Sequence, residues 1–323
     1  MFRTPVIPGK SAEKIKLGQS LLLIGSCFSV HIGQKLTENK FNALTNPFGV
    51  IYNPVSIFKL LGNAILENPI DEKFIIKNQG IYRHYDFHSD ISATDKNELL
   101  SLIGEAYKYS KIYLLNSRWI IITLGTAIVY RHKKLHAIVG NCHKIPSGEF
   151  NKERLQPEEI LNAFATFYTG LKKVNDQFNI ILTVSPVRHI KDSLETNNLS
   201  KSILRYACEI ISETYDNVQY FPSYEIMMDD LRDYRFYETD MLHPNAQAID
   251  YIWEAFQHSY FNDETIGFVK DWRKIRNALQ HKPFYPDSEE HQQFIRNTIQ
   301  QLKIFSEKVD ITSELKILEN QLR

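Results

Sequence analysis

The sequence of 323 residues contains only three cysteines, Cys27, Cys142 and Cys208. They are too few and too scattered for a disulfide framework or a zinc knuckle, and their scarcity fits a reducing compartment. No run of 18 apolar residues is present, which argues against a membrane-spanning helix. The N-terminal stretch also lacks the apolar core and small-residue cleavage site of a signal peptide. We therefore expect a cytoplasmic protein without a membrane partner.

The sequence has no surplus of either charge, because 38 Lys and Arg residues balance 38 Asp and Glu residues. A protein built to bind nucleic acid usually carries a basic surplus, so we expect no nucleic-acid partner. Low-complexity tracts and internal repeats are absent as well. With 43% hydrophobic and 12% aromatic residues, the chain can bury a large core, as one large α/β domain or as two smaller ones.

Apolar runs alternate with segments of helical spacing along most of the chain. Three runs are typical of buried strands: "SLLLIG" (20–25), "RWIIITLG" (118–125) and "NIILTVSP" (179–186). Helical patterns lie between and after them, and Pro54 and Asp95 mark the starts of two of the predicted helices. Two further segments predict β-hairpins: "FIIKNQGIYRHYDFH" (74–88) and "AIVYRHKKLHAIVGN" (127–141). This alternation predicts a mainly parallel sheet with helices on both faces, a three-layer α/β/α domain. In such sheets, ligands bind outside the carboxyl ends of the strands.

The composition changes at about residue 260, where charged and glycine-poor segments of helical spacing begin. We expect residues 1–258 to form the α/β domain and residues 259–323 to form a helical C-terminal extension packed on it. The role of these helices and the oligomeric state stay open at this point.

Two potential nucleophiles, Ser26 and Cys27, follow directly after the first predicted strand and Gly25. A turn from a strand end into a helix points backbone N–H groups and the positive end of the helix dipole at any oxyanion formed there. The same residues would serve as a tight turn and a helix N-cap. A thiolate is the better nucleophile, but buried unreactive cysteines are common. We therefore prefer Ser26 and expect Cys27 to point into the packing face of the helix.

A second motif, "DMLHPN", contains Asp240 and His243, separated by two residues. A short turn lets the carboxylate accept from one imidazole nitrogen while the other nitrogen faces a serine hydroxyl. An exposed loop that precedes an ordinary helix cap is the non-catalytic interpretation of the same residues. A strand-end serine combined with a late Asp-x-x-His favours a serine hydrolase.

These motifs resemble those of the SGNH (GDSL-type) hydrolases and, more narrowly, those of the GSCFA family. "GSCFS" stands where the family has "GSCFA", with Ser29 in place of the alanine. Five further motifs follow in the family's order, over roughly residues 20 to 257: "NPFGVIYNP", "TLGTA", "NCHK", "TVSPVRH" and "DMLHPN". The resemblance implies a flavodoxin-like fold with Ser26 as nucleophile, His243 as general base and then acid, and Asp240 as the orienting carboxylate.

The resemblance also implies an oxyanion hole to which Ser26 and Gly49 contribute. Members of the superfamily place an asparagine in the third motif, where this sequence has Ala127. Either Thr126 or Asn141 would have to supply the missing donor, and the amide of Asn141 is the better chemical substitute. Loss of one donor costs a factor of about 10²–10³ in rate, so this departure bears on how good an esterase the protein is.

The activity implied by the resemblance is hydrolysis of an ester through an acyl-enzyme, with removal of acetyl groups from a carbohydrate as the preferred case. Arg188 and His189 either contact an anionic or sugar-like part of the substrate or are ordinary loop residues. Adjacent residues such as Cys142 and His143 cannot readily chelate one ion, so we expect no metal and no organic cofactor. Two alternatives stay open: an acyltransferase with the same triad, and a non-catalytic binding protein on a hydrolase fold.

Overall fold

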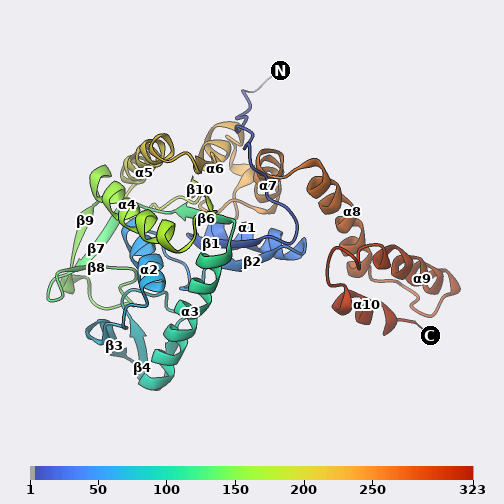
Figure 1. Cartoon of the computed structure of the whole chain (residues 1–323), viewed down its shortest axis with the longest axis horizontal. Coiled ribbons are helices and arrows are strands. Elements are labelled where there is room, and N and C mark those ends of the chain that lie inside the picture. The colour runs from blue at the N-terminus through green and yellow to red at the C-terminus, as the bar shows by residue number, and fades with distance from the viewer. Residues whose placement is uncertain (1–3, 323) are drawn as a thin grey trace.

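The computed structural model describes residues 4–322 and is built around a five-stranded sheet (Figure 1). Every neighbouring pair of strands is parallel, in the order β11-β10-β6-β1-β2. These strands are β1 (Ser20–Gly25), β2 (Asn42–Thr45), β6 (Trp119–Leu124), β10 (Asn179–Val184) and β11 (Val218–Tyr220). The first strand of the sheet therefore lies between the second and the third, which is the flavodoxin-like order.

Helices cover both faces of this sheet. One face carries α2 (Pro54–Leu66), α3 (Lys96–Asn116), α4 (Pro157–Val174) and α5 (Leu194–Thr214), and the other carries α1 (Cys27–Glu38) and α7 (Ala246–Tyr260). In β1, Leu22 and Ile24 pack into the first layer, whereas Leu21 and Leu23 pack into the second. Burial on both faces explains why the strand is a continuous apolar run. The predicted three-layer α/β/α fold with a mainly parallel sheet is confirmed.

Two small antiparallel sheets lie outside the central sheet (Figure 1). The first contains β3 (Ile75–Asn78), β4 (Ile81–His84) and β5 (Ser92–Ala93), and the second contains β7 (Ile128–His132), β8 (Ala137–Val139) and β9 (Phe150–Arg154). The sequence predicts the β3–β4 and β7–β8 hairpins, and both are present. Strand β9 was not expected, because "FNKER" is mostly charged and has no alternating apolar pattern.

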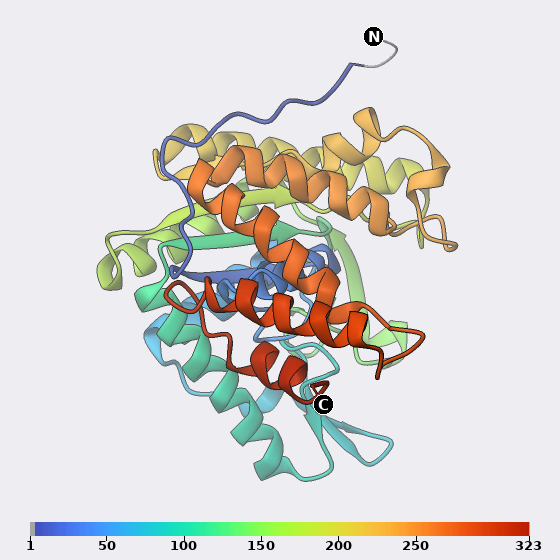
Figure 2. The same ribbon diagram turned by 90° about the vertical axis from the view of Figure 1, so that its right-hand side faces the viewer.

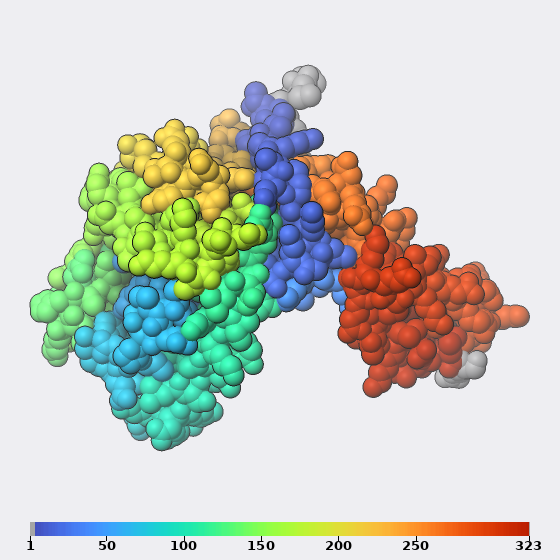
Figure 3. Space-filling view, viewed as in Figure 1, coloured from blue at the N-terminus to red at the C-terminus, as the bar shows by residue number. Residues whose placement is uncertain are grey.

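The chain after α7 is helical, as expected, and its helices are α8 (Asp263–Gln280), α9 (Glu289–Lys303) and α10 (Thr312–Glu319). They form a lobe that projects from the main body in Figure 3 and that faces the viewer in Figure 2. The Trp272 indole N–H donates to the carbonyl of Glu38 at 3.0 Å, and Arg276 forms an ion pair with the Glu38 carboxylate. Within residues 4–322, no helix is both long enough and apolar enough to cross a membrane.

Candidate active site

Ser26 lies at the carboxyl end of β1 and is the N-cap of α1. Its side-chain oxygen accepts from the backbone N–H of Phe28 at 3.3 Å. Gly25 permits the turn, because its φ is 135° and a Cβ atom there would lie only 2.0 Å from the carbonyl oxygen of Thr123. Ser26 has no exposed surface, so an ester reaches its hydroxyl only after neighbouring side chains move.

Two of the predicted oxyanion donors are backbone N–H groups that are engaged inside the protein. The N–H of Ser26 donates to the carbonyl of Thr123 at 3.1 Å, and the N–H of Gly49 donates to the carbonyl of Asn46 at 2.8 Å. The expectation of free N–H groups at these two positions therefore needs correction. The Ser26 turn is thereby hydrogen-bonded to β6, and the loop that contains Gly49 is hydrogen-bonded within itself.

The two side chains predicted to replace the missing asparagine are also engaged. The hydroxyl of Thr126 lies 3.1 Å from that of Ser200 on α5. Asn141 uses its side-chain oxygen to accept from the N–H of His143 at 2.8 Å, and its amide nitrogen lies 3.4 Å from the hydroxyl of Ser89. Asn141 thus belongs to a network of the small sheets, and neither residue has a hydrogen bond to Ser26.

Asn46, which the sequence did not single out, lies against the Ser26 turn. Its side-chain oxygen accepts from the N–H of Gly25 at 2.8 Å, which fixes the orientation of the amide. The amide nitrogen is buried and has no hydrogen-bond partner among residues 4–322. A buried donor without a partner costs about 1–3 kcal/mol, so it calls for an acceptor that arrives from outside. The position of this residue, directly after the second strand in the "NPFG" motif, was the available signal.

Asp240 and His243 are in direct contact. The imidazole Nδ1 lies 2.6 Å from one carboxylate oxygen, and the other oxygen accepts from the backbone N–H groups of Leu242 and His243 at 2.8 and 3.0 Å. These two backbone hydrogen bonds, followed by the bond from the His243 side chain, lower the pKa of Asp240 to about 2. The carboxylate therefore stays ionised at neutral pH and fixes the Nδ1–H tautomer of the imidazole.

The Asp240–His243 loop lies near the turn that holds Ser26 and Cys27, because the charge of Asp240 contributes to the raised pKa of the Cys27 thiol, after burial. Burial, followed by the nearby His243, lowers the pKa of His31 on α1. Burial, followed by Lys201 and then His243, lowers the pKa of His189 to about 4. His243 is therefore close to both α1 and the loop after β10. No hydrogen bond joins His243 to Ser26 among the described residues.

Cys27 occupies the first position of α1 and is half-buried. Burial raises the pKa of its thiol, an effect that the charge of Lys201 opposes. A raised pKa keeps the sulfur protonated at neutral pH and makes it a poor nucleophile. Its environment therefore favours Ser26 over Cys27 as the attacking residue.

Comparison with protein-family models identifies the family. The GSCFA family model matches residues 20–256, and the model described as "GSCFA domain protein, C-terminal domain" matches residues 272–323. The chain belongs to the GSCFA family. Among curated proteins, none matches it.

Solved structures with some similarity to this GSCFA chain include carbohydrate esterases. A family two carbohydrate esterase from Clostridium thermocellum, in complex with cellohexaose, has a TM-score of 0.37 at 10% identity, over 80% of this chain and 67% of that one. A carbohydrate esterase family 3 from Talaromyces cellulolyticus has a TM-score of 0.36 at 8% identity, over 78% and 99%. At these scores, the similarity carries no weight for the activity of this protein.

Lys201 on α5 is a further residue of the GSCFA site that the sequence did not reveal. Its side chain is 1% exposed, and its ammonium donates to the carbonyls of Gly125 and Ser185, each at 2.7 Å. These carbonyls follow β6 and β10, so one lysine joins the "TLGTA" and "TVSPVRH" motifs. Burial lowers the pKa of Lys201 to about 7. A lysine on a helix gives no sequence signal that it reaches into the sheet.

Arg188 and His189 both lie beside this site. The Arg188 guanidinium lies 4.3 Å from the ring centre of Tyr237, and its backbone N–H donates to the carbonyl of Leu242 at 3.3 Å, next to His243. The ring of His189 packs edge-on against Tyr52 at 5.3 Å between ring centres, and its Nε2 is buried without a partner among the described residues. Both residues therefore contact the loops of the site.

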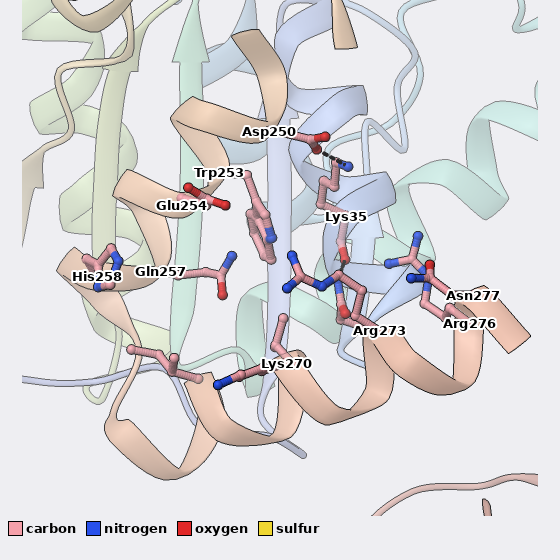
Figure 4. A pocket seen from close by; sticks show the side chains of 13 residues that line it. Lys35, Asp250, Trp253, Glu254, Gln257, His258, Lys270, Arg273, Arg276 and Asn277 are labelled. Atoms are coloured by element: carbon pink, nitrogen blue, oxygen red, sulfur yellow. Dashed lines mark hydrogen bonds and ion pairs between the residues drawn. The ribbon is translucent and has the colours of Figure 1, made fainter. Parts of the chain in front are cut away.

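The surface of this GSCFA protein has one hollow beside the site and a second one away from it. A pocket of about 430 Å³ begins at Tyr52 and Thr126 and extends over the small sheet β8-β7-β9. A groove of about 510 Å³ lies between α1, α7 and α8, where Lys35 and Asp250 form an ion pair, and it holds none of the predicted site residues (Figure 4). Residues 4–322 contain no group of His, Cys, Asp and Glu side chains able to hold a metal.

Proposed function

We propose that this GSCFA protein is a serine ester hydrolase of the SGNH type, acting on acetyl esters of carbohydrates. The observation that carries the proposal is the Asp240–His243 pair at 2.6 Å, in a loop that lies near the turn of Ser26. His243 takes the proton of the Ser26 hydroxyl as the oxygen attacks the ester carbonyl. The same proton then goes to the departing alcohol. Water, activated by His243, releases acetate from the acyl-enzyme.

Binding of the ester has to bring the two halves of this site together. Ser26 is buried and His243 is not hydrogen-bonded to it, whereas the His243 side chain is 40% exposed on its loop. Met241 in this loop has a φ of 59°, a left-handed conformation that costs free energy in a non-glycine residue. Catalytic hydrogen bonds are often long in free enzymes and shorten in the substrate complex. We infer that substrate binding moves this loop towards Ser26.

Asn46 is the side chain that we propose as an oxyanion donor. Its amide nitrogen is a buried donor without a partner, and its oxygen is held by Gly25, the residue before Ser26. An oxyanion formed at Ser26 would satisfy this nitrogen, which offsets the absence of an asparagine at Ala127. This assignment replaces Thr126 and Asn141, whose side chains are engaged elsewhere.

Replacing Asn46 with Asp tests this donor with little change of shape. The carboxylate still accepts from the N–H of Gly25 and tolerates the φ of 46° at this position, but it offers no N–H to an oxyanion. We expect kcat to fall by about 10²–10³ with little change in KM. Steady-state kinetics and urea unfolding of the same variant measure activity and stability separately. A folded variant that keeps kcat within threefold would rule out Asn46.

The proposed reaction is tested by pre-steady-state hydrolysis of p-nitrophenyl acetate. We expect a burst of about one p-nitrophenol per active site, because the acyl-enzyme accumulates, followed by slower turnover. Hydrolysis should be unaffected by EDTA. A folded protein that gives neither burst nor turnover, with this ester and with acetylated xylan oligomers, would contradict the proposal.

We further propose that residues 1–258 form the hydrolase domain and that residues 259–323 form a helical C-terminal extension packed on it. Helices α8, α9 and α10 form the projecting lobe (Figure 3). Trp272 on α8 and Leu302 on α9 belong to the same hydrophobic cluster as Leu36 on α1. Lys40, just after α1, forms an ion pair with Glu314 on α10 at 2.7 Å.

A further inference from the structure

The pocket of about 430 Å³ has Tyr52 and Thr126 in its lining. Tyr52 is near the Ser26 turn, because the backbone N–H of the preceding residue, Ile51, donates to the carbonyl of Gly25 at 3.0 Å. At its inner end, the carbonyl of Tyr52 accepts from the backbone N–H groups of Gly125 and Thr126 at 2.8 and 3.1 Å. The ring of Tyr52 packs against His189, and Tyr52 is close enough to Cys27 for that thiol to contribute to its raised pKa, after burial. A group bound in this pocket therefore lies next to an ester held at Ser26.

The pocket is lined by positively charged side chains and by no negatively charged ones. Its lining contains Lys144 and Lys191 and no Asp or Glu. Within the described part of the chain, neither lysine has an ion pair or a side-chain hydrogen bond. Asp192, which follows Lys191, does not neutralise it, because Asp192 forms an ion pair with Lys152 on β9. In a chain of zero net charge, such a local surplus attracts an anion.

The segment that carries Lys144 has a strained backbone that its surroundings hold in place. His143 and Lys144 are consecutive non-glycine residues with φ of 49° and 59°. The ring of His143 is held by the carbonyl of His84 at 2.9 Å and by the hydroxyl of Ser89 at 3.2 Å. The backbone N–H of His143 donates to the side-chain oxygen of Asn141 at 2.8 Å. Strain maintained in this way is typical of functional sites. Here it places Lys144 in the wall of the pocket.

The remaining lining suits a sugar ring. Aromatic side chains of Tyr52, Tyr130 and Phe150 provide apolar surfaces, and the amides of Asn53 and Asn141 provide polar groups beside them. We propose that this pocket binds an anionic sugar unit of the substrate, with Lys144 and Lys191 contacting its carboxylate or phosphate. This inference rests on the proposed ester hydrolase function and narrows its substrate class.

Three acetylated probes test the inference: galacturonic acid oligomers, their methyl-esterified neutral counterparts, and glucose 6-phosphate. We expect wild-type kcat/KM to be higher for at least one anionic probe than for the neutral one, and the better anionic probe tells a carboxylate from a phosphate. Lys144→Ala and Lys191→Ala should each lower kcat/KM for that probe by about tenfold and leave the neutral probe within twofold. The matched control is Lys173→Ala, which removes an exposed lysine on α4 outside the pocket.

Equal hydrolysis of charged and neutral probes by the wild type would overturn the inference, as would equal losses for both in the lysine variants. Calorimetry with unacetylated galacturonic acid oligomers and with inorganic phosphate separates this inference from the proposed function. If no ester is hydrolysed, saturable binding of either probe to the wild type, lost in the double lysine variant, still supports an anion-binding pocket. Absence of binding to both probes overturns it.

Discussion

Replacing Ser26 with Ala is expected to lower kcat for ester hydrolysis by about 10⁶-fold, the scale of nucleophile loss in a serine hydrolase. Alanine has no hydroxyl at this position to attack the ester, so the acyl-enzyme cannot form. The side chain of Ser26 also caps α1, and loss of a serine cap costs about 1 kcal/mol of stability, which a folded domain tolerates. Steady-state kinetics with p-nitrophenyl acetate measures the effect, and circular dichroism checks the fold.

Cys27→Ala is the matched control for this prediction, because the thiol lies one residue away and burial raises its pKa. We expect this variant to keep kcat within a fewfold of the wild type. An inactive Cys27→Ala variant together with an active Ser26→Ala variant would assign the reaction to the cysteine and refute the account.

Replacing Asp240 with Asn is expected to lower kcat by about 10⁴-fold. The asparagine oxygen can still accept from the backbone N–H of Leu242, so the loop should keep its shape. Its amide nitrogen, however, would donate to Nδ1 of His243, which shifts the imidazole proton to Nε2. An imidazole protonated at Nε2 cannot take the proton of Ser26.

The pH dependence of the wild type follows from the same carboxylate. Asp240 has a folded-state pKa lowered to about 2, so its protonation should not reduce kcat/KM until the pH falls towards that value.

Asp233→Asn is the control for Asp240→Asn. It alters an exposed carboxylate that is paired with Arg235 outside the motif, and it should leave kcat unchanged. An Asp240→Asn variant that retains a tenth or more of wild-type kcat would show that this carboxylate has no orienting role.

The fold could be predicted because its dominant signals are local. The strands β1, β6 and β10 are buried on both faces and are therefore continuous apolar runs, and the helices between them have regular apolar spacing. Asp95 and Pro54 mark helix starts that the structure confirms. Strand β9 was not predicted because it is held by pairing to β7 and not by an apolar face of its own.

Only part of the candidate site could be predicted from the sequence. Asp240 and His243 are three positions apart, so a short turn is enough to bring them together. The roles of Asn46 and Lys201 depend on which donors and acceptors remain unpaired after the loops close on the sheet, and spacing does not reveal this. The same holds for Lys144 and Lys191, which are 47 positions apart in the chain and line one pocket.

Labelling with a fluorophosphonate, followed by peptide mass spectrometry, tests the central claim most directly, because this reagent phosphonylates serine nucleophiles that a neighbouring base activates. The account predicts one phosphonyl group per chain, on the oxygen of Ser26, and no label on the Ser26→Ala variant. A folded wild-type protein that takes no label, or one that takes it on a residue other than Ser26, would contradict it.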